Sequence, residues 1–411
     1  MSGSTSKASS VTRSAAALSE RFAGVAYGEE RKLRPSLESR IYIASRQYHQ
    51  LVDTNGGLIF GWRHEGGAVI GRGDDGSTLL GMASPSEPTL DPVPKGVWIV
   101  LGENPRGLLG DGVRWREVPL SVVDTDAENF ARSAGLSRLD VLAAKRVVVI
   151  GCGSVGAAIT DALGHQGIGE FVLIDPDVFG PHNIGRHQLD WSAVGSSKVN
   201  ALAERLRRIN PSVRVVSHFA DALAEETQLE AIVRDADLVV SAPDSRRVRS
   251  VVNHICVALG TPLVSCAFYE HAVASEIIFV WPDQTPCLRC IHEYDAGVRI
   301  QSDVPYAGKN TQPGEPGLSL DIALGVDISS SIALATLDPS GRRFEGLHPG
   351  YNWIRAHSGQ LPADEWREHF HQPFEVIWYH AEKNPECEHC GPTPDAERTR
   401  QTIRQRAGIE S

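Results

Sequence analysis

The stretch VVVIGCGSVGAAITDALGHQGIGEFVLIDPDVFGPHNIGRHQLDWSAVGSSKV, residues 147–199, decides the fold of this chain. It opens with an apolar run typical of a buried strand and continues through Gly151, Gly153 and Gly156, which form the pattern G-x-G-x-x-G. A helical segment follows, and then a second apolar strand that ends at Asp175. This order of strand, glycine turn, helix and strand predicts a βαβ unit that binds a nucleotide.

Each glycine of this pattern has a physical role. The first permits a tight turn, the second lets a phosphate approach the backbone, and the third lets the helix pack close to the strand. The helix N-terminus then presents its amides and its positive dipole end to an anion. Asp175 can accept hydrogen bonds from ribose hydroxyls, which NAD and ATP share, so the unit alone does not choose between them.

Polar residues after the second strand point to phosphoryl chemistry. Asn183, Arg186 and Lys198 follow Asp175 at short spacing, and Asp244 comes directly after the apolar run LVVSAP. Hydride transfer needs no cations here, whereas attack of a carboxylate on an α-phosphate builds negative charge that cations stabilise. An Asp at the carboxyl end of a strand suits Mg²⁺ held with triphosphate oxygens. The set therefore favours ATP-dependent adenylation of a carboxylate over an NAD-dependent oxidoreductase.

Four of the seven cysteines form two widely separated Cys-x-x-Cys pairs. The four are Cys287, Cys290, Cys387 and Cys390. In a reducing compartment such pairs favour a metal over disulfides. Tetrahedral thiolate coordination suits Zn²⁺, and four protein ligands leave no open position for chemistry, so we expect a structural zinc site.

Composition narrows the class of protein. The chain has 411 residues, of which 41% are hydrophobic and 22% charged, as in ordinary soluble globular proteins. The formal net charge of −11 argues against a general nucleic-acid-binding protein, and it disfavours a tRNA-linked substrate. No apolar run reaches the roughly 18 residues that span a bilayer, and the Ser- and Ala-rich start lacks a secretory apolar core. We therefore expect a cytoplasmic protein without membrane contact.

Strands and helices alternate along much of the chain. This alternation predicts an α/β fold with a Rossmann-like, mostly parallel sheet and flanking helices. We expect a disordered tail over 1–35, a smaller accessory α+β domain over 36–125, the nucleotide-binding domain with its zinc site over 126–391, and a charged, frayed tail over 392–411. Within the third segment, residues 319–337 are predicted to form a buried helix.

The ordered series GCGSVG, IDPDV, NIGRH, SSKV and APDS resembles the ThiF/MoeB/HesA family, which is similar to the adenylation domains of ubiquitin-activating enzymes. The resemblance covers roughly residues 130–390. It implies an enzyme that uses ATP, Mg²⁺ and Zn²⁺ to adenylate the C-terminal carboxylate of a ubiquitin-like or sulfur-carrier protein and releases pyrophosphate. It also implies a homodimer and a downstream conjugation partner.

The resemblance assigns a role to each residue of the series. Gly151, Gly153, Gly156, Asp175 and Asn183 would bind ATP, with Asp175 on the ribose. Arg186 and Lys198 would hold the phosphates with Asn183, and Asp244 would take Mg²⁺. The family supplies an arginine across the dimer interface from a helix before the first strand. Arg132 is the candidate here, although the usual Arg-Gln motif is missing.

The chain departs from many relatives in one respect. These relatives carry a nucleophilic cysteine in a crossover loop after the first Cys pair, but residues 291–316 contain no cysteine. Cys266, after the strand PLVS, is the remaining candidate nucleophile, if a neighbour lowered its pKa. The open alternatives are adenylation of a peptide or another carboxylate without a thioester, and a non-catalytic adaptor with this fold.

The N-terminal region carries a second resemblance. IYIASRQYHQLVDTNGGLIFGW, residues 41–62, is similar to the opening of a JAB-type peptidase domain. Such domains hold zinc with a His-x-His motif, which is absent from residues 36–125, so a peptidase is excluded. The region either recognises the protein substrate or only extends the dimer, and a truncation starting near Asp126 would separate these two roles.

Overall fold

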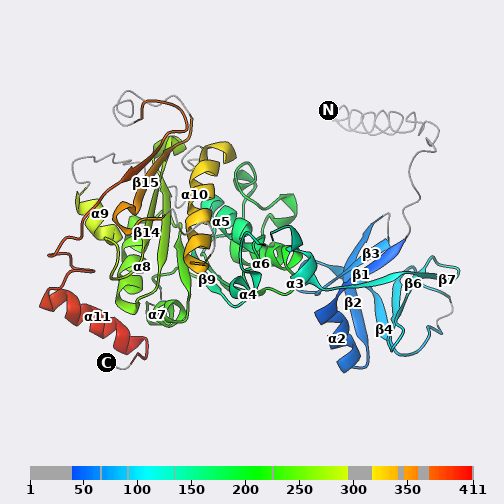
Figure 1. The fold of residues 1–411 in the computed structure, drawn as a ribbon. Coiled ribbons are helices and arrows are strands. Elements are labelled where there is room, and N and C mark those ends of the chain that lie inside the picture. The colour runs from blue at the N-terminus through cyan, green and yellow to red at the C-terminus, as the bar shows by residue number, and fades with distance from the viewer. Residues whose placement is uncertain are drawn as a thin grey trace, which may run out of the picture.

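The computed structural model describes residues 39–64, 67–89, 92–133, 135–224, 226–294, 317–340, 347–359 and 370–409. They form two lobes, each built on an eight-stranded sheet (Figure 1). The expectations for the tail over 1–35 and for most of the loop over 291–316 lie outside the described residues.

The N-terminal lobe is a curled mixed sheet with one helix. Its elements are β1 (Arg40–Ala44), α2 (Ser45–Asp53), β2 (Gly57–His64), β3 (Gly67–Gly71), β4 (Thr78–Ser84), β5 (Val97–Val100), β6 (Arg106–Gly110), β7 (Trp115–Val118) and β8 (Leu120–Val123). The strand order is β7-β6-β5-β4-β2-β3-β1-β8. A Cβ added at Gly107 would lie 2.7 Å from Ile41 Cδ1, so β6 lies against β1 and closes the core. The predicted small α+β lobe is confirmed.

The C-terminal lobe contains the predicted α/β sheet. Its strands are β9 (Arg146–Ile150), β10 (Glu170–Ile174), β11 (Arg214–His218), β12 (Leu238–Ser241), β13 (Leu263–Phe268), β14 (Ala274–Val280), β15 (Trp353–His357) and β16 (Val376–Tyr379). The order is β11-β10-β9-β12-β13-β14-β15-β16, with β11 to β13 parallel and the last three strands antiparallel. The β12 strand is buried throughout, which is why its sequence is apolar without alternation.

Helices cover both faces of this sheet (Figure 1). One face carries α5 (Ser154–Gly164), α6 (Lys198–Ile209) and α10 (Ser319–Leu337), and the other carries α7 (Glu226–Arg234), α8 (Arg246–Leu259) and α9 (Leu288–Tyr294). The short elements are α3 (Thr125–Glu128), η1 (Ala131–Ser133), α4 (Leu139–Leu142), η2 (Pro181–Asn183), η3 (Trp191–Ala193), η4 (Glu270–Ala272) and η6 (Pro349–Tyr351). The mostly parallel, doubly covered sheet matches the fold predicted from the sequence.

Helix α10 is strongly apolar and has no distinct polar face. By length and composition it is the one described helix that could cross a membrane. The sequence analysis expected no apolar run of this length. More than half of it is buried inside the protein, where it packs on α5, β13 and β14. An all-round apolar helix of this kind is typical of a protein core, as predicted for residues 319–337.

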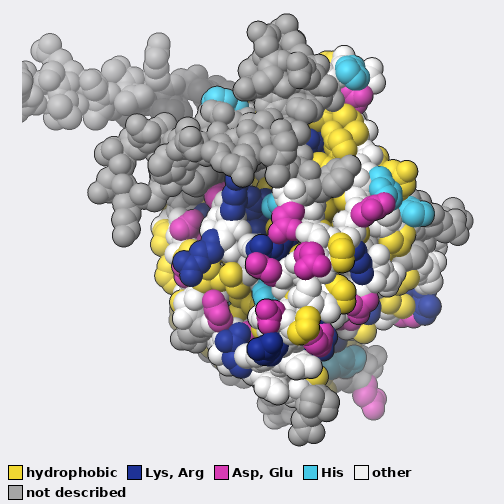
Figure 2. All heavy atoms as spheres, turned by 90° about the vertical axis from the view of Figure 1, so that its left-hand side faces the viewer, with side chains coloured by type: hydrophobic (Ala, Val, Ile, Leu, Met, Phe, Trp, Pro, Cys, Tyr) yellow, Lys and Arg dark blue, Asp and Glu magenta, His cyan; other side chains and the backbone are white. Residues whose placement is uncertain are grey.

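The C-terminal segment is ordered, contrary to the expectation of a frayed tail over 392–411. It forms α11 (Pro394–Arg406), which packs on α7 and α8. The buried Arg400 donates to the carbonyls of His389 and Gly391 at 2.9 and 3.0 Å. The face that carries α9 and α11 mixes acidic and basic side chains, and the described residues there form no broad basic stripe (Figure 2).

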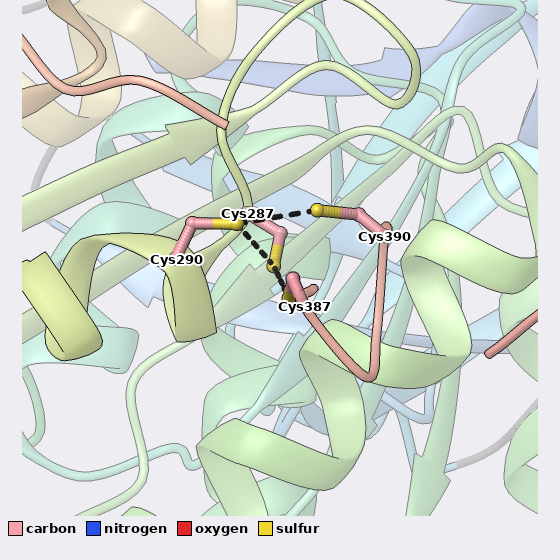
Figure 3. A group of neighbouring side chains, drawn as sticks. All are labelled: Cys287, Cys290, Cys387 and Cys390. Carbon is pink, nitrogen blue, oxygen red and sulfur yellow. Dashed lines mark hydrogen bonds between the residues drawn. The ribbon is translucent and has the colours of Figure 1, made fainter. Parts of the chain in front are cut away.

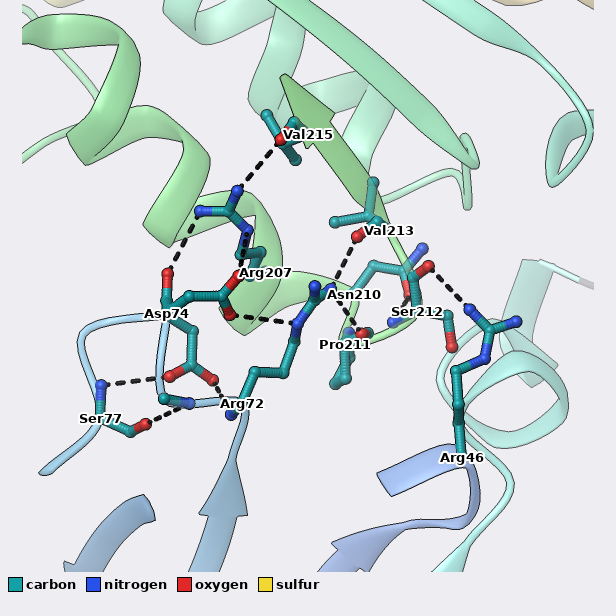
Figure 4. A network of polar contacts seen from close by, with 12 residues as sticks. Arg46, Arg72, Asp74, Ser77, Arg207, Asn210, Pro211, Ser212, Val213 and Val215 are labelled. Atoms are coloured by element: carbon teal, nitrogen blue, oxygen red, sulfur yellow. Dashed lines mark hydrogen bonds and ion pairs between the residues drawn. The ribbon is translucent and has the colours of Figure 1, made fainter. Parts of the chain in front are cut away.

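The two lobes are joined by arginines that bind backbone carbonyls (Figure 4). Arg72 donates to the carbonyls of Pro211 and Val213 at 3.0 and 2.8 Å. Arg207, on α6, donates to the carbonyl of Asp74 in the N-terminal lobe at 3.2 Å and to that of Val215 in its own lobe at 3.1 Å. The N-terminal lobe therefore binds the turn between α6 and β11. This turn lies at the opposite end of α6 from Lys198.

Candidate active site and metal centre

The glycine loop lies between β9 and α5, at the carboxyl edge of the parallel strands. A Cβ at Gly156 would come 1.8 Å from the Gly151 carbonyl oxygen, so only glycine permits this helix–strand contact. Gly151 has φ +87°, and a Cβ there would meet the Pro243 nitrogen at 2.7 Å. A Cβ at Gly153 would meet nothing within 4 Å. Packing thus requires the outer two glycines, whereas Gly153 faces open space, which fits the approach of a phosphate.

Asp175, Asp177 and Lys198 form a compact charged group beside this loop. The buried Asp175 accepts hydrogen bonds from the backbone N–H groups of Cys152 and Asp177 at 2.7 and 2.9 Å. Lys198 Nζ lies 2.7 Å from Asp177 Oδ2 and 3.9 Å from Asp175 Oδ1. The Asp-x-Asp pattern in the sequence was the signal for Asp177, which the sequence analysis did not assign a role.

The charges of the site act on one another. Burial raises the pKa of Asp175, and the Lys198 ammonium partly opposes this. Desolvation by surrounding protein atoms raises the pKa of Asp244, and the charges of Lys198 and Arg186 oppose this shift. Part of the Asp244 surface is nevertheless open to solvent. Burial alone would lower the pKa of Lys198, but Asp175 and then Asp177 raise it above its ordinary value. Lys198 therefore stays cationic while it faces three carboxylates.

The four paired cysteines converge on one buried cluster (Figure 3). The distances between sulfurs are 3.8 Å for Cys287–Cys290, 3.6 Å for Cys287–Cys387 and 3.3 Å for Cys290–Cys390. These separations are too long for disulfides, which need about 2.05 Å. They approach the separation of about 3.8 Å that tetrahedral coordination with Zn–S bonds of about 2.3 Å requires. The donor set therefore fits a zinc ion without an open coordination position.

Comparison with known proteins finds a family match over much of the C-terminal lobe. Residues 127–316 match the ThiF family. The chain contains a ThiF family domain. Adenylyltransferase and sulfurtransferase MOCS3 of Mus musculus is 32% identical over 213 residues, which cover 50% of this chain and 45% of that protein. Molybdopterin-synthase adenylyltransferase of Escherichia coli is 33% identical over 156 residues, which cover 37% of this chain and 60% of that protein.

Other relatives share the same part of the chain. SAMP-activating enzyme E1 of Haloferax volcanii is 33% identical over 151 residues, 36% of this chain and 54% of that protein. The chain thus spans about half the length of the curated relatives it matches. Among solved structures, E. coli MccB with ATP has a TM-score of 0.47 at 19% identity and covers 62% of this chain and 68% of that chain.

Asn183 and Arg186 follow the ThiF domain's second strand. The Asn183 side-chain oxygen accepts from the Gly180 backbone N–H at 2.9 Å, so this oxygen stabilises the local turn. Arg186 is half-buried, and a Cβ added at Gly317 would lie 3.9 Å from its Nη1 atom. Its charge also acts on Asp244, which places Arg186 on the same side of the glycine loop as the other predicted site residues.

Arg132 is not brought to the active site of its own ThiF domain. It is exposed in η1, and the preceding Phe130 lies near Gly167, which connects α5 to the start of β10. This is the amino edge of the parallel strands, opposite the glycine loop. A role for Arg132 therefore requires a second copy of the chain and stays a prediction.

His187 braces the glycine loop of the ThiF domain, a role that its place in the sequence did not indicate. The buried ring bonds through Nε2 to the Cys152 carbonyl at 3.0 Å, and its Nδ1 accepts from the Leu189 N–H at 3.1 Å. The ring must therefore be neutral with its proton on Nε2. Burial lowers the pKa of His187 from 6.5 to about 4.

We expect His187→Gln to flatten the acid side of the stability profile. The folded state holds His187 neutral, whereas the unfolded chain protonates it below about pH 6.5, so its stabilisation is complete above that pH and is lost as the pH falls towards about 4. Between pH 7 and pH 5 the wild type should lose about 2 kcal/mol more unfolding free energy than the variant. Urea denaturation at both pH values measures this, and equal losses would contradict the assignment.

The surroundings of Cys266 in the ThiF domain do not favour a nucleophile. Its side chain is only 2% exposed, and its sulfur lies 4.0 Å from the Gly325 carbonyl of α10. Burial raises the pKa of the Cys266 thiol to about 12, so no thiolate forms near neutral pH. The sequence placed Cys266 at the correct end of β13 but could not show that α10 covers it.

Proposed function

We propose that this chain binds Mg-ATP and adenylates the C-terminal carboxylate of a ubiquitin-like or sulfur-carrier protein, releasing pyrophosphate. One observation carries the proposal: Lys198 lies between Asp175 and Asp177 beside a glycine loop, with Asp244 coupled to the same lysine. The names of relatives support it, since they include adenylyltransferases, a SAMP-activating enzyme and ubiquitin-like modifier-activating enzymes.

The reaction needs charge stabilisation more than proton transfer. A carboxylate oxygen of the substrate forms a bond to the α-phosphorus, while the bond from this phosphorus to the bridging oxygen breaks and pyrophosphate leaves with the electron pair. Lys198 and Arg186 would stabilise the negative charge that builds on the phosphates. Asp175 would hold the ribose, and Asp244 would hold Mg²⁺. When bound, Mg²⁺ neutralises charge on the triphosphate.

The proposed chemistry has no thioester step on this chain. All seven cysteines lie among the described residues: four form the metal cluster, and Cys152, Cys256 and Cys266 are buried. Burial raises the pKa of each of the latter three thiols. The acyl-adenylate would then pass directly to an acceptor, which also keeps open a peptide or another carboxylate as substrate.

ATP–pyrophosphate exchange tests the proposed function. The assay uses a ubiquitin-like protein with a free C-terminal glycine carboxylate, and the same protein with an amidated C-terminus is the control. Exchange with the free carboxylate alone would support the proposal. Absence of exchange with every carboxylate tested, despite ATP binding, would favour the adaptor.

We expect Cys266→Ser to keep exchange activity within about threefold of wild type, because the thiol neither titrates nor reaches solvent. A non-reducing gel of the wild type after incubation with ATP and substrate should show no thiol-sensitive adduct. A reducible adduct that disappears in the Cys266→Ser variant would contradict this prediction.

The proposed assembly is a cytoplasmic homodimer in which Arg132 of one copy completes the site of the other. The N-terminal lobe would recognise the protein substrate, and the truncation starting near Asp126 remains the test of that role. The C-terminal lobe, with its zinc site, would catalyse the adenylation. The division of the chain into the segments 1–35, 36–125, 126–391 and 392–411 stays a proposal.

A further inference from the structure

A second group of charged and polar side chains, three of them buried and charged, lies beside the proposed active site and has no role in the chemistry described so far. It joins α8, α9 and the antiparallel strands of the sheet. Its members are Arg249, Tyr269, Glu276, His292 and Arg355. Arg249, Glu276 and Arg355 are 8%, 8% and 2% exposed, so three formal charges are buried together. Such a group is costly unless each charge is compensated.

The negative charge of Glu276 is balanced by hydrogen bonds and nearby cations. Its Oε1 accepts from the Tyr269 hydroxyl at 3.1 Å, and its Oε2 lies 3.2 Å from His292 Nε2. The Arg355 guanidinium donates to the same Tyr269 hydroxyl at 2.9 Å. Although burial opposes ionisation, His292, Arg249 and Arg355 hold the pKa of Glu276 at about 2. The carboxylate is therefore ionised, and its two oxygens are shared among several donors.

The positive charge of Arg249 has fewer and longer polar contacts than the charge of Glu276. Among the described residues its carboxylate contact joins Nη1 to Glu276 Oε2 at 3.9 Å, which is too long for a hydrogen bond. Its Nε atom is buried and has no hydrogen-bond partner in the part of the chain that the structure describes. A buried guanidinium with an unused donor is expensive, because the cation has lost water without gaining an equivalent acceptor. A planar, two-oxygen anion is the partner that its geometry fits best.

The position of Arg249 connects it to the adenylation chemistry. It lies in the first turn of α8, where its backbone N–H bonds to the Ser245 carbonyl at 3.1 Å, and Ser245 directly follows Asp244. Asp244 and Arg249 also affect each other's ionisation. Arg249 thus stands one helical turn from the residue proposed to hold Mg²⁺, on the side of the sheet that carries Glu276.

We propose that Arg249 binds the carboxylate of the substrate and orients it for attack on the α-phosphate of ATP. This inference rests on the proposed function. One carboxylate oxygen bonds to the α-phosphorus as pyrophosphate leaves, and the other becomes the acyl carbonyl oxygen, which keeps a hydrogen bond from Arg249. No proton is transferred in this step. Arg249 is therefore a catalytic residue that selects the carboxylate, distinct from the residues that hold the phosphates.

The test uses two stable adenosine probes, so it does not depend on knowing the protein substrate. The first, 5′-O-[N-(acetylglycyl)sulfamoyl]adenosine, carries the acyl carbonyl of a glycyl adenylate, and the second, 5′-O-sulfamoyladenosine, lacks the acyl group. Calorimetry gives the affinity of each probe for the wild type, Arg249→Gln, Arg249→Lys and the control Arg247→Gln. Arg247 is exposed on the same helix turn.

We expect the wild type to prefer the acyl probe. Arg249→Gln should reduce this preference by roughly 10–100-fold, because a charge-assisted hydrogen bond is lost, while affinity for the probe without the acyl group changes by less than about threefold. Arg249→Lys should retain part of the preference, and Arg247→Gln should match the wild type. Unchanged zinc content in all variants is the check on the fold.

Three results would count against these ideas in different ways. A wild type without preference for the acyl probe contradicts the proposed function itself. A preference that survives in Arg249→Gln overturns the role of Arg249 and leaves the proposed function standing. Equal loss of both probes, with a lower melting temperature, would make Arg249 a structural partner of Glu276 and would also overturn the inference.

Discussion

Replacing Lys198 with alanine is expected to lower kcat/KM for ATP–pyrophosphate exchange by roughly 10²–10³-fold, the range seen when one preorganised charge-stabilising donor is removed from an active site. Lys198 is 8% exposed and begins α6 at the carboxyl edge of the sheet. Among the described residues it is the one cation that forms ion pairs with both Asp175 and Asp177. Its removal therefore leaves two carboxylates facing the triphosphate without their cation.

Lys145→Ala is the matched control for this prediction. Lys145 also forms an ion pair with an aspartate, 2.8 Å from Asp237, but it lies before β9, at the far edge of the sheet from the glycine loop. Loss of an ion pair as such should therefore leave exchange unchanged, and only loss of the ammonium at the active site should lower it. Exchange in Lys198→Ala within threefold of wild type would remove Lys198 from the mechanism.

The parts of the site that the sequence predicted are local or follow from strand order. The glycine loop, Asp175 and Asp244 each come directly after an apolar strand, and parallel neighbours place their carboxyl ends at one edge. Lys198 could be predicted in the same way, because a helix start near that edge points its first residues towards the loop. The four clustered cysteines could be paired because Cys-x-x-Cys spacing is itself a pattern of metal coordination.

The parts that the sequence did not predict depend on contacts between distant elements. Arg249 meets Glu276 only because α8 packs over β14, and no spacing in the chain indicates that pair. The sequence placed Cys266 near the active edge but did not show that α10 covers it. The charged segment before the C-terminus looked disordered because its arginines seemed solvated, whereas Arg400 and Arg404 bind backbone carbonyls.

The metal cluster is the other place where one substitution should have a large effect. We expect Cys387→Ser to lose zinc and at least about 4 kcal/mol of unfolding free energy, a fall of roughly 10 °C in Tm, because metal-binding energy is folding energy in a closed thiolate site. Cys387 is 0% exposed, and its sulfur lies 3.6 Å from that of Cys287, the residue before α9.

Metal analysis and thermal unfolding of Cys387→Ser, with Cys256→Ala as control, separate the metal from ordinary packing. Cys256 is equally buried but lies outside the cluster, so its truncation should leave one zinc per chain. Loss of the metal should also release α11, since Arg400 binds the His389 and Gly391 carbonyls on either side of Cys390. Protease cleavage should then appear first after residue 380. A wild type without bound zinc, or a Cys387→Ser variant as stable as wild type, would show that the four thiols pack without a structural metal.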